Sequence, residues 1–498
     1  MILNAGQSTN GHRATLDELF RRAGVRHPDA LALTDPPNSE RITGRPPRKL
    51  TYAEADRAVA AFAGRLRGFG PQTDTVVAIQ MANTVDSIVA LLGVLRAGMI
   101  AAPLPQLWRV QDMVSALALV GAKAIITCSR IGAHAPAESA VRVAAELFPI
   151  RWIGGFGPDL PDGVAPLDDC IDGTVADFFQ PSTRPGLAAS HVAVVTVDVT
   201  SDGLVPLARS HRELIAGGLA AFPEGVPIDA NILSTIPIGS FAGIALSVIP
   251  WLVGGGTFAL HHGFDAAVFA EQMRAQQPSI VVLPGPALLP LADAGLIGSP
   301  RQTILGLWRA PERLAGAPPW RHEAALVDIA SFGEIGLLPA RRGTDGLSAP
   351  IPLGAIRPPR GGPNAEVVLE TAPGKSGTLL LRGTMVPAPA FPSAAASAPD
   401  GFRDTGYSCR IAANGQTLVL TAPPAGITAT GYYRFRQADV DAAVAAADPA
   451  AVIAALPDAQ LGQRLAGHAE DRVAAASELA ARGVNALIAG AFRTRSAA

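Results

Sequence analysis

Residues 196–214 (TVDVTSDGLVPLARSHREL) have the outline of a loop that binds phosphate, with an apolar strand before it and a helix after it. Such loops hold phosphate through glycine N–H groups and a lysine. Here Gly203 is the one glycine, and lysine is absent. Thr200, Ser201 and the N–H of Gly203 can donate hydrogen bonds, whereas Asp202 would repel an anion. We therefore expect a loop that keeps its shape but has weakened phosphate chemistry.

The helix after this loop begins with a capping box, Ser210 and Glu213. We interpret Ser210 and the neighbouring His211 as structural rather than catalytic. His261 and His262 are adjacent, so their side chains would point apart at the end of a strand. The sequence contains no GxSxG, HExxH or GxGxxG motif that would indicate another kind of active site.

Helix and strand signals alternate around these residues, as they do in βαβ units. Thr51 and Glu54 form a second capping box before a helix with apolar residues at helical spacing. Thr84 precedes another such helix, which Gly98 ends. Strands are predicted at 75–81, 122–127, 192–197, 257–260 and 280–283.

The composition limits the possible functions. The 498 residues are enough for several cores and at least two domains. A net charge of −2 provides no electrostatic basis for binding nucleic acid. The three cysteines, Cys128, Cys170 and Cys409, have no metal-ligand spacing and favour a reducing, cytoplasmic setting. The first residues have neither signal-peptide nor transit-peptide character.

Residues 232–262 raise the question of a membrane span, because they contain no Asp, Glu, Lys or Arg. Pro237, Pro250 and the glycines at 254–256 interrupt the segment. We therefore predict a buried helix and strand, and no membrane span.

The character of the chain changes near its C-terminal end. Residues 387–399 (PAPAFPSAAASAP) are rich in proline and alanine and predict an exposed loop. A strand at 417–420 follows, and the last helix, at 471–482, is closed by Gly483. We predict an α/β fold with a large body of several subdomains at 1–420 and a small α+β domain at 421–498.

The order of longer segments carries a family resemblance. It includes LTYAEADRAVAAFAGRLRGFG, VVAIQMANTVDSIVALLGVLRAGMIAAPL, AKAIITCS, TIPIGSFAGIALSVIPWLVGGGTFALHHGFD, SFGEIGLL, GFRDTGY and GYYRFRQADVDAAV. The series resembles the class I adenylate-forming superfamily, which comprises acyl-CoA synthetases, aryl acid-activating enzymes and related luciferases. The resemblance covers nearly the whole chain. It implies an AMP-binding-type N-terminal domain and a C-terminal lid that is truncated relative to the family.

The resemblance also implies a reaction. Members of this superfamily use ATP and Mg²⁺ to convert a carboxylic acid into an acyl-adenylate. Many then transfer the acyl group to the thiol of CoA or of the phosphopantetheine of an acyl carrier protein. The implied ligands are thus ATP, Mg²⁺, a carboxylic acid or acyl thioester, and CoA or phosphopantetheine.

The positions that the resemblance assigns to the nucleotide have changed. They are Thr200, Ser201, Asp202 and Gly203 for the phosphates, Trp308, Arg309 and Ala310 for adenine, and Tyr407 for ribose. Val205 stands in place of the phosphate-binding lysine, and Tyr407 replaces a carboxylate. Bulk at Trp308 and Arg309 predicts a blocked or altered adenine pocket. Glu334 survives as a Mg²⁺ and phosphate ligand, or alternatively caps the loop that follows it.

Two features needed for catalysis are also altered. The hinge of the lid corresponds to residues 421–428, where Pro423 and Pro424 fix φ and predict a lid held in one position. No lysine follows Lys375, so the catalytic lysine of the lid is missing. Arg493 or Arg495 would offer a charge of different geometry. Losing one charged transition-state contact costs about 3–4 kcal/mol.

The acyl and thiol positions are better preserved. The acyl pocket is assigned to Gly239, Ser240 and Phe241, and the small residues there are expected to widen it. Gly431 and Tyr432 match the lid residues that lie near the CoA or pantetheine tunnel of the family. An acyl or thioester cleft is therefore expected to remain.

These observations leave two main hypotheses. The favoured one is a ligand-binding or accessory descendant that has lost most ATP-handling residues and keeps an acyl or thioester cleft. The alternative is a working ATP-dependent ligase that joins a carboxylic acid to CoA or a carrier protein. A third, ATP-independent thioester chemistry, has no identified nucleophile.

Overall fold

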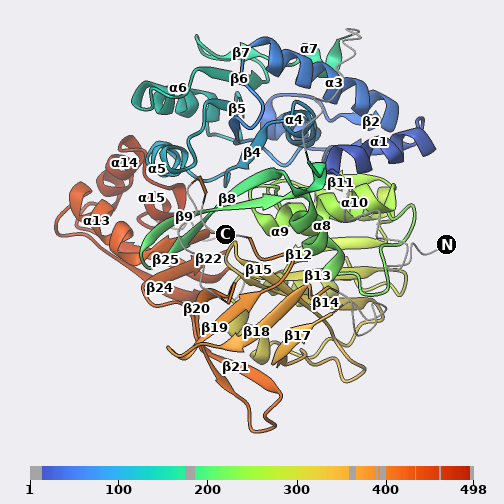
Figure 1. Cartoon of the computed structure of the whole chain (residues 1–498). Helices are drawn as coiled ribbons and strands as arrows, with labels where there is room; N and C mark the ends of the chain where they lie inside the picture. Colours follow the sequence, from blue (N-terminus) through green and yellow to red (C-terminus); the bar gives the residue numbers. More distant parts are fainter. Residues whose placement is uncertain are drawn as a thin grey trace.

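We describe the fold from a computed structural model of the chain (Figure 1). The structure describes residues 14–173, 186–357, 366–387, 391–392, 400–431, 433–458 and 461–493.

A seven-stranded sheet, at the top of Figure 1, organises the N-terminal part of the body. All of its neighbouring strands run parallel except the last pair, β8 and β9. Its order is β7 (Ala165–Pro166), β6 (Trp152–Phe156), β5 (Ala124–Cys128), β3 (Val76–Ile79), β4 (Ile100–Pro103), β8 (Val192–Thr200) and β9 (Gly203–Ser210). Its connecting helices are α3 (Tyr52–Gly68), α4 (Val85–Arg96), α5 (Val110–Val120), α6 (Pro136–Glu146) and α7 (Asp169–Asp172).

An eight-stranded sheet forms the second layer of the body. Its order is β15 (Gly336–Arg341), β14 (Ala325–Phe332), β13 (Thr303–Trp308), β12 (Ile280–Pro284), β10 (Ile232–Ser234), β11 (Phe258–Leu260), β1 (Leu31–Thr34) and β2 (Lys49–Thr51). The accompanying helices are α1 (Leu16–Arg26), α2 (Ser39–Thr43), α8 (His211–Ala220), α9 (Phe241–Gly243), α10 (Ile249–Gly254), α11 (Ala266–Gln276) and α12 (Leu288–Asp293). One apolar core includes residues of both sheets, so the two layers pack together.

The segment 232–262 forms β10, α9, α10 and β11 inside this layer, as predicted. Within the described parts of the chain, no helix is both long enough and apolar enough to span a bilayer.

A six-stranded antiparallel sheet completes the body, at the bottom of Figure 1. Its order is β16 (Ile351–Pro352), β21 (Thr417–Ala422), β20 (Arg403–Ile411), β19 (Thr378–Arg382), β18 (Leu369–Pro373) and β17 (Gly354–Ile356).

The C-terminal elements form a smaller unit, which we call the lid, shown in red beside α5 in Figure 1. It has an apolar core of its own, with residues from Phe435 to Phe492. Its elements are β22 (Ile427–Thr430), β23 (Tyr433–Arg436), α13 (Gln437–Ala447), β24 (Val452–Asp458), β25 (Gly462–His468), α14 (Arg472–Ala481) and α15 (Ala486–Gly490). The α/β class with a large body and a small α+β lid is thus confirmed, while the exact division after residue 420 stays a prediction.

Local sequence signals predicted the helix ends well, with one exception. The capping boxes at Thr51 and Ser210 are both formed, and Asp471 caps α14. Thr84 occupies the N-cap of α4, but its side chain makes no capping bond. The carboxylate of Asp35 accepts the N–H of Val85 instead, at 2.7 Å. A distant residue therefore caps this helix.

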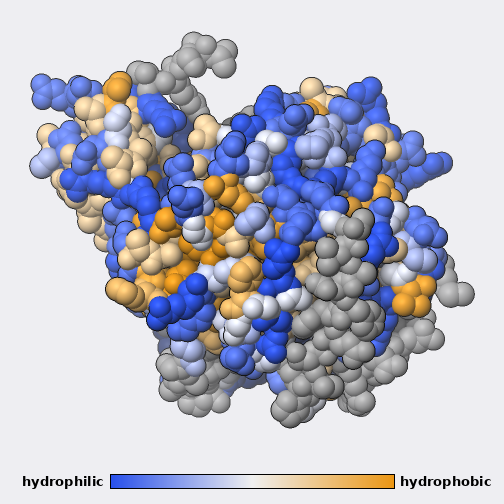
Figure 2. All heavy atoms as spheres, turned by 90° about the horizontal axis from the view of Figure 1, so that it is seen from above, coloured by the Kyte–Doolittle hydropathy of each residue, from blue (hydrophilic) through white to orange (hydrophobic). Residues whose placement is uncertain are grey.

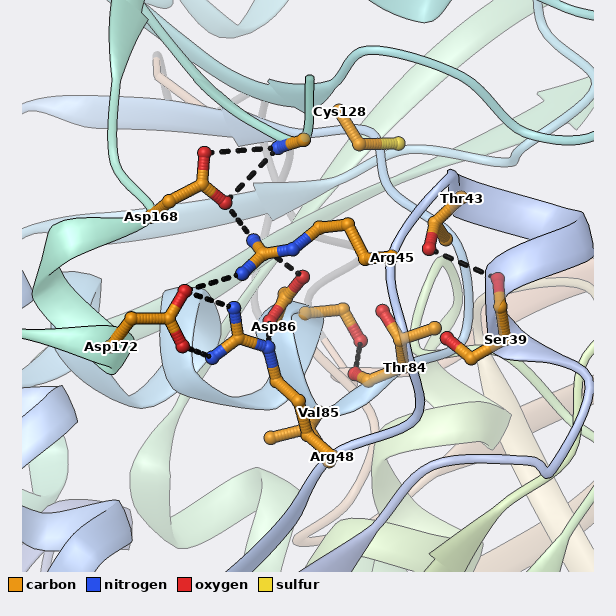
Figure 3. A network of polar contacts seen from close by, with 12 residues as sticks. Ser39, Thr43, Arg45, Arg48, Thr84, Val85, Asp86, Cys128, Asp168 and Asp172 are labelled. Atoms are coloured by element: carbon orange, nitrogen blue, oxygen red, sulfur yellow. Dashed lines mark hydrogen bonds and ion pairs between the residues drawn. The ribbon is translucent and has the colours of Figure 1, made fainter.

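A network of charged side chains joins the segment between α2 and β2 to α4 and α7 (Figure 3). Arg45 and Arg48 both bind Asp172, with Nη2–Oδ2 distances of 2.7 Å. Arg45 also binds Asp168, and Nε of Arg48 lies 3.3 Å from Oδ1 of Asp86. The sequence did not reveal this network, because its members lie far apart along the chain.

Asp35, which caps α4, makes the stability of the body depend on pH. Burial raises the pKa of its carboxyl, and the charge of Asp86 raises it further. The folded state therefore keeps a proton at pH values where the unfolded chain, with a pKa of about 4, has lost it. We expect the free energy of unfolding to fall as pH rises above about 4. In Asp35→Asn, the free energy of unfolding should fall less steeply with pH, because the carboxyl that keeps the proton is gone.

Urea unfolding across this pH range measures the effect. Asp29 is exposed and belongs to the same part of the chain, so Asp29→Asn should keep the wild-type slope. Equal slopes for wild type and Asp35→Asn would contradict the expectation.

Seen from above, hydrophilic residues cover most of the visible face, and apolar residues gather in one area left of centre (Figure 2).

Candidate functional site

The expected phosphate loop is a tight turn between β8 and β9. The strand ladder continues to the pair Thr200 and Gly203, so Ser201 and Asp202 alone make the turn. The hydroxyl of Thr200 donates to the carbonyl of Gly203 at 2.9 Å and accepts the N–H of Asp202 at 3.3 Å. Regular strand pairing therefore reaches both ends of a two-residue turn, and the expectation that the loop keeps its shape stays a prediction.

A buried ion pair links this hairpin to the lid. Nη1 of Arg434, on β23, lies 2.9 Å from Oδ1 of Asp198, on β8. The side chains are 8% and 4% exposed, so solvent screens the pair little. A Cβ placed on Gly333 would lie 2.2 Å from Nη1 of Arg434 and 2.4 Å from Oδ2 of Asp198. The pair thus packs directly against the turn that precedes Glu334.

Glu334 is buried and engaged by the protein itself. Its carboxylate accepts the N–H of Phe241 at 2.6 Å and pairs with Arg309, with an Oε1–Nη1 distance of 3.3 Å. Arg309 also donates to the hydroxyl of Ser240 at 2.7 Å. Burial raises the pKa of Glu334, and the charge of Arg309 opposes that rise. One network thus joins three kinds of expected site residue: Arg309 of the adenine segment, the magnesium ligand Glu334, and Ser240 and Phe241 of the acyl pocket.

A fully buried arginine lies beneath this network. Arg209 donates to the carbonyls of Glu334 and Ile335, and its guanidinium stacks on the ring of Phe241 at 3.8 Å. Burial lowers the pKa of Arg209 to about 10, so it stays charged at neutral pH. Arg209 therefore fixes the backbone around Glu334.

The expected ribose position is also enclosed. Tyr407 packs edge-on against Phe332, and its hydroxyl donates to the carbonyl of Arg309 at 3.4 Å. Burial raises the pKa of this phenol. The nearby Asp404 points to the other side of β20, where it accepts the hydroxyl of Thr378 at 2.8 Å. Asp404 therefore does not replace the missing carboxylate.

Trp308 fills the space that small residues would leave at the end of β13. A Cβ on Gly285 would lie 2.4 Å from its indole ring. Its Nε1 donates to Asp328 at 2.8 Å, and Asp328 is paired with Arg342 at 2.7 Å. Trp308 is thus a bulky residue packed against Gly285, and a blocked or altered adenine pocket stays a prediction.

A cleft of about 410 Å³ opens beside Trp308, between body and lid. The lid contributes Ala429, Gly431 and Leu461 to its lining. The body contributes Pro284, Gly285, Pro286, Leu288, Leu289, Pro290, Leu307, Trp308, Arg309, Ala310, Arg313, Gly316, Ala317, Pro318, Trp320, Leu326 and Arg342. The structure thus brings the expected adenine segment and Gly431 to one cleft. Tyr432, the other expected lid contact, lies outside the described residues.

The expected acyl positions are tightly packed. Phe241 is fully buried, and a Cβ on Gly239 would lie 2.7 Å from the carbonyl oxygen of Leu104. The cavity that Gly239 lines measures about 10 Å³, at the lower limit for one water molecule. The small residues therefore do not widen this cavity, because the segment around Leu104 closes on it.

The candidate histidines make contacts within the protein. His211 accepts the N–H of Leu16 at 3.2 Å, which is a structural contact. His261 and His262 bind different partners, Gln272 and the N–H of Asn83, as expected for adjacent residues pointing apart. Arg493 lines a second pocket, which is formed by lid residues and does not include the expected adenine segment, and Arg495 is outside the described residues.

Within the described ranges, no group of three or more His, Cys, Asp or Glu side chains could hold a metal ion. Sequence reasoning missed Arg434 and Arg209. Arg434 is 236 residues from Asp198, so no local pattern could reveal their pairing.

The fold and this arrangement can be compared with known proteins. Residues 20–153 match the family model described as AMP-binding enzyme. Long-chain fatty acid transport protein 2 of Rattus norvegicus is 25% identical over 235 residues, which make up 47% of this chain and 37% of that protein. The matched part thus spans little more than a third of that relative.

Two solved structures extend the likeness over the whole fold. The amide bond synthetase McbA of Marinactinospora thermotolerans superimposes with a TM-score of 0.69 at 18% identity, covering 95% of this chain and 94% of that one. A double mutant of o-succinylbenzoate CoA synthetase from Bacillus subtilis, bound with a product analogue, gives 0.68 at 13% identity, covering 94% and 92%. At these identities the structures establish the fold alone. The segment 20–153 is thus similar to AMP-binding enzymes, and the chain as a whole has the fold of the two synthetases.

Proposed function

We propose that this protein is a ligand-binding or accessory descendant of the superfamily, which holds an acyl or thioester ligand in the cleft between body and lid without using ATP. One observation carries the proposal: charged side chains at and beside the positions that the resemblance assigns to Mg·ATP pair with each other. Asp198 pairs with Arg434, and Glu334 pairs with Arg309. The residues present do not fit Mg·ATP in this arrangement.

The β8–β9 hairpin supports the same conclusion. A phosphate loop needs several N–H groups that point to one anion. Here β8 and β9 pair with each other up to Thr200 and Gly203, so their backbone groups are engaged in the sheet. The residue that faces Val205 across the hairpin is the buried Asp198. A triphosphate would meet a carboxylate where the family has a lysine.

The cleft supports binding of an apolar ligand. Its walls are mainly prolines, leucines, alanines, glycines and two tryptophans, and its volume of about 410 Å³ is in the range of small-molecule sites. The ligand that suits it is a carboxylic acid or its thioester, carried on CoA, on phosphopantetheine or on an acyl carrier protein. A reducing compartment such as the cytoplasm would suit the buried free cysteines.

Binding of S-octanoyl-pantetheine to the full chain tests the proposal, because this probe has an acyl thioester and no phosphate. Ala310 lines the cleft, and Ala315 is exposed outside its lining. We expect Ala310→Trp to weaken binding about tenfold or more by filling the cleft, while Ala315→Trp leaves it unchanged. Calorimetry that finds no binding to the wild type, or equal affinities for both variants, would contradict the proposal.

The alternative is a working ATP-dependent acid–thiol ligase. The observation that favours it is the retained Glu334, which lies close to the guanidiniums of Arg309 and Arg209. For this function, the pairs made by Glu334 and Asp198 would have to open when Mg·ATP enters. The nucleotide measurement described in the Discussion separates the two functions.

A further inference from the structure

The lid contains a second pocket, which lies on the opposite face of β22 from the cleft. Its volume is about 400 Å³, and Thr430 lines it, whereas Ala429 and Gly431 line the cleft. Side chains on a strand alternate between its two faces. Leu461 borders both the cleft and this pocket, while the other residues that line this pocket are its own, and we call it the lid pocket.

Three arginines surround the lid pocket: Arg464 on β25, Arg472 at the start of α14, and Arg493 after α15. In the part of the chain that the structure describes, none of them lies within 4 Å of a carboxylate. The nearest acid in sequence, Asp471, uses its carboxylate to cap α14 through Val473 and Ala474. Three arginines thus line one pocket without a paired carboxylate among the described residues.

Two polar atoms in the pocket wall lack partners. Thr430 is 3% exposed, and its buried hydroxyl makes no hydrogen bond to any described residue. Nε of Arg472 is also buried and has no partner in the described structure. Buried donors without acceptors are unfavourable and rare in native proteins. An acceptor-rich ligand in the pocket would satisfy both atoms and the charges around them.

The chemistry of the pocket defines its ligand. Guanidinium groups bind phosphate oxygens with matching geometry, and a hydroxyl adds a further donor. The pocket is much larger than a phosphate ion, and Leu465, Leu487 and Ala491 supply apolar walls. We propose that the lid pocket binds a phosphate monoester with a compact apolar body. The proposal does not depend on the function of the cleft.

Calorimetry on the full chain with phenyl phosphate tests this proposal. We expect phenyl phosphate to bind more tightly than inorganic phosphate, and benzyl alcohol not to bind, because the site needs both the anion and the apolar body. Raising the salt concentration from about 50 to 300 mM should weaken binding, since the charges are partly exposed. Binding of benzyl alcohol as tightly as phenyl phosphate would overturn the proposal.

Variants separate binding from folding. Arg464→Gln with Arg472→Gln should weaken phenyl phosphate binding about tenfold or more. Arg482→Gln is the matched control, because Arg482 ends the same helix and is paired with Glu478 at 2.7 Å, away from the pocket. Equal affinities in the double variant and the control would overturn the proposal.

Thr430→Val covers the case in which the arginine variants do not fold. The hydroxyl of Thr430 has no partner among the described residues, so its removal should not lower the unfolding temperature. It should still weaken phenyl phosphate binding several-fold. A loss of stability without any loss of binding would show that the hydroxyl has a structural role and would count against the proposal. Binding of S-octanoyl-pantetheine should be unchanged in all three variants, since it reports on the cleft alone.

Discussion

Arg434→Met should release the lid from the body. The substitution leaves the carboxylate of Asp198 buried, with an exposed fraction of 4%, and without its counter-charge. Removing one partner of a buried ion pair costs about 3–5 kcal/mol. We expect the amides of β22 and β23 to exchange with solvent roughly 100-fold faster or more, because each 1.4 kcal/mol changes the opening equilibrium about tenfold. Hydrogen exchange detected by mass spectrometry measures this.

Two further variants make the result specific to the pair. Arg436 lies on the same strand but pairs with Asp439 near the surface, so Arg436→Met should change protection by less than about 1 kcal/mol. Asp198→Asn combined with Arg434→Met removes both charges, and should recover part of the protection lost in Arg434→Met. Wild-type exchange rates in Arg434→Met would show that the ion pair does not hold the lid.

The lid has other contacts that should limit the size of this effect. The hydroxyl of Tyr433 accepts the N–H of Leu107 at 3.0 Å, and Gly483 packs against Val110 at the start of α5. Release of the lid should therefore be local opening of β22 and β23 rather than unfolding of the chain.

The fold could be predicted from two kinds of sequence signal: short local patterns at helix ends, and the order of long segments that resemble the family. Thr51 and Glu54 lie three residues apart, so their capping box could be found in the sequence. Pro237 and Pro250 correctly marked the uncharged segment at 232–262 as part of the body. The series of family-like segments indicated the α/β body and the small lid.

The candidate site was predictable only in part, because its contacts join distant residues. The sequence showed that Val205 replaces a lysine, but not that β8 and β9 pair up to Thr200 and Gly203. It left open whether an arginine replaces the missing lysine of the lid. The structure shows Arg434 of the lid paired with Asp198 of the body. Such pairing depends on how the lid packs on the body, and no pattern along the chain reports it.

Restoring single family residues should not restore nucleotide binding, because the structure around those residues has changed. A lysine at position 205 would face Asp198 across the hairpin, and an aspartate at 407 would be buried beside Phe332. We expect Val205→Lys combined with Tyr407→Asp to show no pyrophosphate exchange and to be less stable than the wild type, since the new carboxylate would be buried.

The central claim, that the site no longer uses ATP, is tested most directly by thermal unfolding of the full chain with and without millimolar Mg·ATP or AMP. A ligand at about 100 times its dissociation constant stabilises the folded state by about 2.7 kcal/mol, which raises the unfolding temperature by a few degrees. We predict no shift with either nucleotide and a clear shift with S-octanoyl-pantetheine. A shift of a few degrees with Mg·ATP or AMP would contradict the account and favour a working ligase.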